Sequence, residues 1–295
     1  MMKAKVLVTG AYGQLGNEIR AHSAHSENLE FLFTDYDSLD ITDDEAVMYW
    51  FFQNRPGYVI NCAAYTAVDK AEEDRENAFL LNSRGPENLA RACSVVQAKM
   101  IHLSTDYVFD GTSCQPYTEK DMPNPSGVYG ASKLQGENLA IAADPTVVII
   151  RTSWLYSSFG NNFVKTMMRL GRERDALKVV YDQVGTPTYA GDLAAAIIHI
   201  LEGSSSGRIN WHPGIYHYSN EGVCSWYDFA AEIHRKAGIT CNLYPVESKD
   251  FPTLARRPSY SVLNKAKIKS AYQLQIPWWR SSLEKCIDLI QKNTL

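Results

Sequence analysis

Short apolar runs alternate with longer segments of helical periodicity through the first half of the chain. The runs predict buried strands at Lys5–Thr9, Glu30–Thr34, Tyr58–Asn61, Met100–Ser104 and Val147–Arg151. The segments between them predict helices at Gln14–Ser23, Asp43–Gln53, Ala78–Val96 and Tyr129–Ala143. Buried strands that alternate with helices indicate a Rossmann-like α/β fold, in which a doubly wound parallel sheet binds ligands at the carboxyl ends of its strands.

The pattern becomes less regular after Arg151. A further strand is expected at Lys178–Tyr181, and helices are expected at Asp192–Leu201, Trp226–Ala237 and Ser282–Gln291. We therefore predict a dinucleotide-binding domain over residues 1–153 and a smaller, mixed C-terminal domain over residues 154–295 that mainly binds substrate. Segments at about residues 180–202 are expected to return to the Rossmann half.

Composition narrows the class of protein. The chain has 295 residues, 45% of them hydrophobic, which is enough for a full core. Its net charge is −4 and it has no basic stripe, so nucleic acid is not expected as a partner. The apolar run before Gly10 is too short for a signal peptide, and no segment approaches the roughly 20 apolar residues of a membrane span. Six scattered cysteines without a C-x-x-C pair indicate thiols in a reducing compartment, so we expect a cytoplasmic protein. As its oligomeric state we expect a monomer or a homodimer.

A glycine-rich turn follows the first predicted strand directly and opens a helix. It reads Gly10, Ala11, Tyr12, Gly13, Gln14, Leu15, Gly16, with the spacing G-x-x-G-x-x-G. Glycines allow a tight turn and a close backbone approach, and the free N–H groups of a helix N-terminus favour an anion. Glycine turns between strands and helices are common, but this one stands at the first strand and helix, so we predict a site for a dinucleotide pyrophosphate.

Residues after the second and third strands complete this predicted cofactor site. Asp35 follows the second strand at a distance suited to accepting hydrogen bonds from ribose hydroxyls, although a solvated turn carboxylate would look the same. No Arg or Lys adjoins Asp35 to pair with a 2′-phosphate, which favours NADH over NADPH. Other residues expected around the cofactor are Asp40, Ile41, Ala63, Ala64 and Tyr65.

Tyr129 and Lys133 lie four residues apart, on one face of a predicted helix. Reduction of a carbonyl needs a proton donor for its oxygen, and a free tyrosine, with a pKa near 10, releases its proton reluctantly. A nearby cation stabilises the phenolate, and Lys133 could supply that cation and also hold the nicotinamide ribose. The spacing alone is common by chance on surface helices. The position of Tyr129 and Lys133 in the chain, after the glycine turn, favours a catalytic pair.

A hydroxyl at the end of the fourth strand would complete this centre. Ser104 and Thr105 both stand there, and we choose Thr105 because the chain must emerge just beyond Ser104 to meet a ligand. The alternative is a hydroxyl that only caps the turn. Thr105 is expected to bond the substrate carbonyl beside Tyr129.

These motifs together resemble the extended short-chain dehydrogenase/reductases, and within them the dTDP-4-dehydrorhamnose reductases of nucleotide-sugar and cell-wall polysaccharide biosynthesis. The resemblance covers nearly the whole chain. The segments that carry it are Asn61–Glu72, Ser104–Phe109, Arg151–Tyr156, Gly160–Phe163, Asp182–Thr188 and Arg256-Arg257-Pro258 followed by Ser261.

The resemblance implies an NAD(P)H-dependent oxidoreductase. Hydride would pass to C4 of dTDP-4-dehydro-L-rhamnose, and Tyr129 would protonate the new alkoxide. Trp154 could instead be an ordinary core residue, but its place after a strand favours a platform for the sugar. Residues that the resemblance places at the substrate are Val68, Thr105, Asp106, Tyr107, Trp154, Asn162 and Arg257.

The resemblance leaves a metal site open. Some members of the family dimerise through Mg²⁺ held by glutamates, and Glu18 occupies one such position. Gly191 or Asp192 falls where another glutamate would be expected, so a Mg²⁺-bridged dimer is doubtful and no metal ligand is assigned.

Rival functions share the scaffold. The 4,6-dehydratases use an Asp-Glu pair where this chain has Asp106 and Tyr107, and a tyrosine cannot serve as their carboxylate base. Another nucleotide-sugar reductase or an epimerase remains an alternative. So does a non-catalytic regulatory nucleotide-binding subunit, but Tyr129 and Lys133 are both intact, which favours an enzyme.

Overall fold

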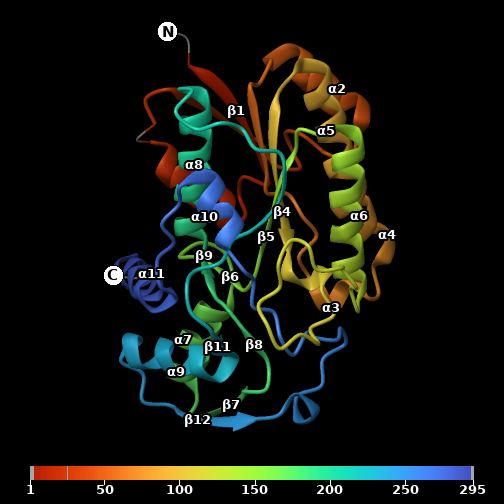
Figure 1. The fold of residues 1–295 in the computed structure, drawn as a ribbon. Coiled ribbons are helices and arrows are strands. Elements are labelled where there is room, and N and C mark those ends of the chain that lie inside the picture. Colours follow the sequence, from red (N-terminus) through yellow and green to blue (C-terminus); the bar gives the residue numbers. More distant parts are fainter. Residues whose placement is uncertain (1–2, 25, 294–295) are drawn as a thin grey trace.

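A six-stranded parallel sheet forms the centre of the computed structural model, which describes residues 3–24 and 26–293 (Figure 1). Its strand order is β10-β5-β4-β3-β1-β2, and every neighbouring pair is parallel. The strands are β1 (Ala4–Thr9), β2 (Leu29–Phe33), β3 (Tyr58–Asn61), β4 (Lys99–Thr105), β5 (Val148–Thr152) and β10 (Gly214–His217). The predicted Rossmann-like α/β class is therefore confirmed.

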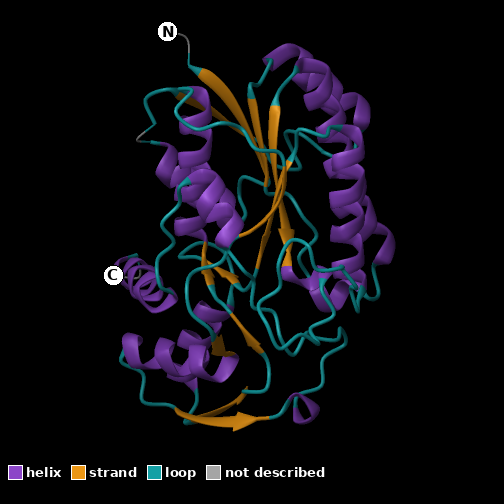
Figure 2. Cartoon of the chain, in the orientation of Figure 1, coloured by secondary structure: helices purple, strands orange, loops and turns teal. Residues whose placement is uncertain are grey.

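Helices cover both faces of the sheet, as Figure 2 shows. One face carries α1 (Gln14–Ser23), α8 (Ala190–Ser205) and α10 (Ala266–Tyr272), and the other carries α2 (Asp44–Asn54), α5 (Gly85–Val96) and α6 (Val128–Ala143). Side chains of a strand alternate between faces, so Val6 and Val8 pack towards α1 and α8 while Leu7 packs towards α2 and α5. Burial on both faces explains why the strands are continuously apolar.

The strand order reverses between β1 and β3, which opens a crevice at their carboxyl ends. From β1 the chain goes to β2 on one side, and it then returns to β3 on the other. The turns after β1 and β3 come very close there. A Cβ atom on Gly10 would lie 2.6 Å from the backbone nitrogen of Ala63, so only glycine fits.

A second group of elements packs around its own core, in the lower half of Figure 1. Its helices are α7 (Phe163–Glu173), α9 (Trp226–Ala237) and α11 (Trp279–Lys292). Its strands are β6 (Leu155–Tyr156), β7 (Ala176–Val180), β8 (Val184–Gly185), β9 (Thr188–Tyr189), β11 (Cys224–Ser225) and β12 (Asn242–Val246). The shared core includes Val164, Phe229 and Leu283. The boundary at residues 153 and 154 stays a prediction, since α8, β10 and α10 of the later chain belong to the layers of the large sheet.

Several parts of the fold differ from the predicted elements, and α7 and β12 are among the elements that were not predicted. The segment predicted as one helix over Ala78–Val96 begins as α4 (Arg75–Phe79), passes through a π-helical turn, η1 (Leu80–Arg84), and continues as α5. Gly136 of α6 packs against this turn, where a Cβ would lie 2.0 Å from the carbonyl oxygen of Asn82. β10 and α10 were not predicted, because each is too short to show a clear period.

Short helices connect the strands to the ligand side. They are α3 (Val68–Ala71) after β3 and the 3₁₀ turn η2 (Asp106–Val108) after β4. A further 3₁₀ turn, η3 (Ser248–Asp250), follows β12. α3 and η2 follow carboxyl ends of the sheet, so their side chains reach the crevice between the two groups of elements.

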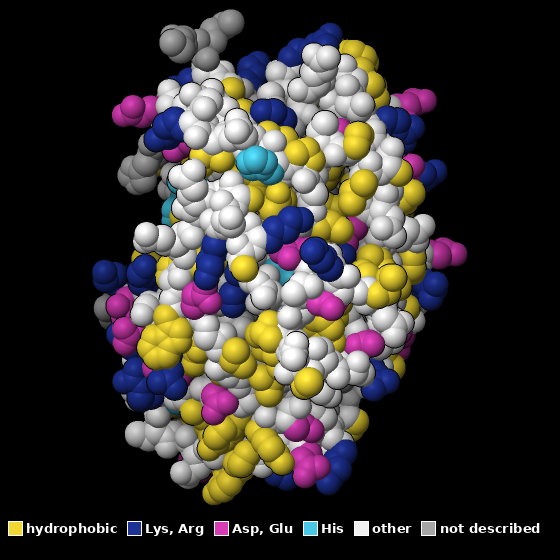
Figure 3. Space-filling view, viewed as in Figure 1, with side chains coloured by type: hydrophobic (Ala, Val, Ile, Leu, Met, Phe, Trp, Pro, Cys, Tyr) yellow, Lys and Arg dark blue, Asp and Glu magenta, His cyan; other side chains and the backbone are white. Residues whose placement is uncertain are grey.

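The surface mixes charges of both signs on the face drawn in Figure 3. Apolar side chains gather on that face at its lower end, over β7 and β12. Within the part of the chain that the structure describes, no helix has the length and apolarity to cross a membrane. All six cysteines are free thiols; Cys93, Cys224 and Cys286 are buried, whereas Cys114 is exposed.

Candidate active site

A cavity of about 710 Å³ lies at the carboxyl ends of β1, β3, β4 and β5. Residues of the predicted cofactor and substrate sites line it together. They are Gly10, Gly13, Gln14, Leu15, Gly16, Asp35, Asp40, Ile41, Ala63, Ala64, Val68, Thr105, Asp106, Tyr107, Tyr129, Lys133, Trp154 and Asn162. The fold therefore brings segments from the whole first half of the chain, and from beyond residue 153, to one place.

The glycine turn has the shape that a pyrophosphate site needs. Gly10 adopts a φ of +62°, and a Cβ on Gly16 would lie 2.5 Å from the carbonyl oxygen of Gly10. Gly13 is the N-cap of α1 and has no side chain to accept from the N–H groups of the first turn. Those groups and the helix dipole can therefore receive an anion, so the turn fits a dinucleotide.

Asp35 joins the end of β2 to the glycine turn. Its carboxylate accepts the backbone N–H of Tyr12 at 2.9 Å and that of Tyr36 at 2.9 Å. The Tyr12 side chain is 73% exposed and does not line the cavity. The backbone N–H of Tyr12 therefore helps to fix the Asp35 carboxylate, and it is Asp35 that lines the cavity.

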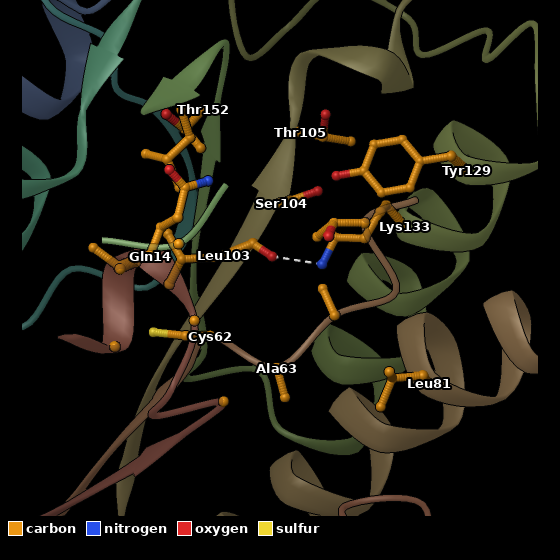
Figure 4. A pocket seen from close by; sticks show the side chains of 18 of the residues that line it. Gln14, Cys62, Ala63, Leu81, Leu103, Ser104, Thr105, Tyr129, Lys133 and Thr152 are labelled. Carbon is orange, nitrogen blue, oxygen red and sulfur yellow. Dashed lines mark hydrogen bonds between the residues drawn. The ribbon is translucent and has the colours of Figure 1, made fainter. Parts of the chain in front are cut away.

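Tyr129, Lys133 and Thr105 meet at the centre of the cavity (Figure 4). Burial raises the pKa of Tyr129 above its usual value, and a hydrogen bond with Thr105 opposes that rise. Burial also lowers the pKa of Lys133 to about 8, against the attraction of Glu137. The Lys133 ammonium donates to the carbonyl oxygen of Leu103 at 2.6 Å. The three side chains thus place a phenol, an ammonium and a hydroxyl together in a buried centre.

Ser104 and Thr105 have different partners. The Ser104 hydroxyl donates to the buried carboxylate of Glu137, whereas Thr105 contacts Tyr129. Thr105 also donates to Asp106 at 3.1 Å. This geometry supports the choice of Thr105 as the hydroxyl that accompanies Tyr129.

Asp106 and Tyr107 form one wall of the cavity. Burial raises the pKa of Asp106 to about 7, although the hydrogen bond from Thr105 acts against it. The Tyr107 ring lies edge-on to that of Tyr129, with 5.5 Å between centroids. At neutral pH Asp106 is therefore present in both its protonated and its ionised form, so it can donate or accept a hydrogen bond in this wall.

Trp154 and Asn162 reach the cavity from the later chain. Trp154 has a φ of +48° and stacks on Trp226 with 3.6 Å between ring centroids. Asn162 donates to the Gln14 side chain at 3.0 Å, which ties the loop before α7 to the glycine turn. The Trp154 ring is therefore backed by a second ring, as a stacking platform requires.

Tyr65 and Arg257, like Tyr12, lie outside the cavity lining. The Tyr65 phenol donates to Asp74 at 3.0 Å and so is held away from the cavity. Arg257 is held beside the cavity wall, where it donates to the phenol oxygen of Tyr107 at 3.0 Å.

The sequence analysis missed several lining residues. Cys62 follows β3, Thr152 is the last residue of β5, and Ser153 follows it. The rule that ligands bind at the carboxyl ends of strands could have found all three. Leu81 stands on the π-helical turn, which no sequence period revealed. The full set is Tyr36, Leu39, Cys62, Leu81, Leu103, Ser104, Thr152, Ser153, Leu155, Gly160 and Asn161. Thr66, expected beside the cofactor together with Ala63, Ala64 and Tyr65, also lines the cavity.

Glu18 is buried inside the chain. Its carboxylate accepts the Ser157 hydroxyl at 2.6 Å and hydrogen-bonds the Tyr189 phenol. In residues 3–24 and 26–293 no three His, Cys, Asp or Glu side chains gather as a metal site. These internal contacts give Glu18 a structural role, and no metal function is assigned to it.

Comparisons with known proteins identify the family of this chain. Residues 3–292 match the family described as the RmlD substrate binding domain. The dTDP-4-dehydrorhamnose reductase of Aggregatibacter actinomycetemcomitans is 42% identical over 95% of this chain and 97% of its own. A crystal structure of that enzyme from Clostridium acetobutylicum superposes with a TM-score of 0.91 at 46% identity, and covers 97% of this chain and 99% of its own.

A second crystal structure bears on the cofactor. The dTDP-4-dehydrorhamnose reductase of Bacillus anthracis, in complex with NADP, has a TM-score of 0.91 and 41% identity, with 97% of this chain and 99% of that chain covered. The glycine turn, the Tyr129 centre and these likenesses point the same way: this chain belongs to the RmlD substrate binding domain family.

Proposed function

We propose that this protein reduces the C4 ketone of dTDP-4-dehydro-L-rhamnose to dTDP-L-rhamnose with NAD(P)H. The observation that carries the proposal is the contact between Thr105 and Tyr129, in a cavity that also contains Lys133 and the glycine turn. Two relatives that are 42% and 46% identical to this chain bear the name dTDP-4-dehydrorhamnose reductase.

The residues of the chain can perform the proton half of this reaction. NAD(P)H supplies the hydride to C4. When the ketone binds, the Thr105 hydroxyl turns its single proton from Asp106 to the ketone oxygen. Tyr129 then donates its phenol proton to that oxygen as it becomes an alkoxide. Since the Tyr129 pKa is raised, the phenol is protonated at neutral pH and ready to donate. Hydride and proton together convert the ketone into an alcohol.

Lys133 contributes a positive charge in a buried place. Its ammonium is fixed by the Leu103 carbonyl, and it can stabilise the phenolate that Tyr129 leaves. We propose that it also bonds the nicotinamide ribose. A lysine whose pKa is lowered to about 8 keeps this charge at neutral pH.

We assign binding of the nucleotide sugar to the part of the cavity lined by Asp106, Tyr107 and Trp154. Trp154 offers a ring face to the sugar, and Asp106 and Tyr107 offer hydrogen bonds to its hydroxyls. Arg257, at the rim, offers a guanidinium to the diphosphate. NADH or NADPH as the cofactor, a cytoplasmic location and a monomeric or homodimeric state complete the proposal.

The test is a cofactor-oxidation assay. Purified protein is mixed with dTDP-4-keto-6-deoxy-L-mannose and either NADH or NADPH, and the absorbance of the reduced cofactor is followed. We expect a loss of absorbance with at least one cofactor and dTDP-L-rhamnose as product. An absence of oxidation with both cofactors, while either one binds, would contradict the reductase and favour the epimerase or the regulatory subunit.

A further inference from the structure

Three consecutive residues of β4 meet three successive turns of α6. The Leu103 carbonyl accepts from Lys133, the Ser104 hydroxyl donates to Glu137, and Thr105 bonds Tyr129. The partners on α6 are four residues apart and therefore share one face of the helix. Two of the three contacts involve the proposed catalytic groups, and the middle one does not.

Glu137 is the anchor of the middle contact. It is fully buried, and Arg151 of β5 binds both of its oxygens, Nε at 2.9 Å from Oε1 and Nη2 at 2.6 Å from Oε2. Ser104 donates to the same carboxylate. A carboxylate with a two-point guanidinium contact is held in one orientation, so it can hold Ser104 in turn.

We propose that Glu137 is a positioning residue, which fixes β4 against α6 so that Leu103 and Thr105 meet Lys133 and Tyr129, and places a negative charge behind Lys133. The inference rests on the proposed reductase function for its effect on turnover. Its effect on the charge of Lys133 does not depend on turnover.

The charge around Lys133 supports this role. The titratable and charged groups around the ammonium are Cys62 after β3, His102 of β4, Glu137 of α6 and, paired with Glu137, Arg151 of β5. Burial raises the pKa of Cys62 to about 12 and lowers that of His102, so both are neutral at pH 7. Glu137 is then the anion that favours a protonated Lys133. We therefore expect removal of the Glu137 charge to lower the pKa of Lys133 further.

The experiment compares two variants. Ser104→Ala removes the link to β4 and leaves the Glu137–Arg151 pair intact. We expect kcat to fall by about tenfold or more, with the alkaline limb of its pH profile unmoved. Glu137→Gln removes the charge as well. We expect the same fall, and an alkaline limb shifted by about one pH unit towards acid.

A binding measurement separates this inference from the proposed function. NADH affinity is titrated against pH by fluorescence, where the inflection that Lys133→Met abolishes reports Lys133. It is expected near pH 8 in the unmodified protein and lower in Glu137→Gln. If this shift occurs in a protein that does not turn over the sugar, the reductase proposal fails alone.

Controls address folding. Arg151 would lose its partner in Glu137→Gln, so Glu137→Gln/Arg151→Met serves if the single variant does not fold. Glu232→Gln neutralises an anion paired with Arg235 on α9, away from the cavity, and is expected to change neither kcat nor the inflection. The inference is overturned if folded Ser104→Ala and Glu137 variants keep both the kcat and the alkaline limb of the unmodified protein.

Discussion

Arg257 and Tyr107 are 150 residues apart in the sequence, yet the guanidinium of Arg257 donates to the phenol oxygen of Tyr107 at 3.0 Å. The same guanidinium pairs with Asp69 after β3 at 2.5 Å. The late segment of the chain is thereby fastened beside the cavity wall. Under the proposed function, the guanidinium of Arg257 is the group assigned to the diphosphate of the nucleotide sugar.

Arg257→Ala is expected to weaken binding of the nucleotide sugar. Because a hydrogen bond to a charged group is lost, we expect the KM for the nucleotide sugar to rise by roughly tenfold to a hundredfold. The affinity for NAD(P)H should be unchanged. The neighbouring Arg256 is exposed and is the matched control. Steady-state kinetics on both variants check this, and equal KM values for Arg256→Ala and Arg257→Ala would count against a role for Arg257.

Tyr129→Phe is expected to remove the proton donor and leave the cavity otherwise intact. We expect kcat to fall by about 10²–10⁴-fold, with the affinity for NAD(P)H retained. Turnover is measured by cofactor oxidation and affinity by fluorescence titration. Tyr49→Phe, at an exposed position on α2, serves as the control and should be fully active. Near-normal turnover of Tyr129→Phe would show that another group gives the proton.

Asp106→Asn is expected to stabilise the protein at alkaline pH. The folded pKa of Asp106 is about 7, above its ordinary value of 3.8, so folding is penalised when the carboxyl ionises. The penalty is absent below pH 3.8, develops between 3.8 and about 7, and is complete above that pH. Urea unfolding at about pH 8 should show a gain on the order of 2 kcal/mol, which shrinks at about pH 5. A gain independent of pH would contradict this cause.

Gly16→Ala is expected to distort the turn that receives the pyrophosphate. The added Cβ would lie 2.5 Å from the carbonyl oxygen of Gly10 and 2.6 Å from the Cα of Ala11. Such a clash costs enough to weaken NAD(P)H binding by about tenfold to a hundredfold. At Gly57 the nearest atom would be 3.8 Å away, so Gly57→Ala is the control and should bind cofactor normally. Equal affinities in a binding titration would refute this account of the turn.

The sequence by itself determined the class of fold and the order of its main parts. Apolar runs such as Val6–Val8 predict strands buried on both faces, because side chains that alternate between two helix layers must all be apolar. The glycine turn and the four-residue spacing of Tyr129 and Lys133 are local features, so a single stretch of chain reveals them.

Only the tertiary structure decided which distant residues complete the site. Trp226 lies beneath Trp154, Leu81 enters the cavity from a π-helical turn, and Glu137 takes Ser104 while Thr105 is left to Tyr129. Local periodicity reports which face of an element is buried, but not which element covers it. Packing between separate elements makes these contacts, and their register depends on the whole core.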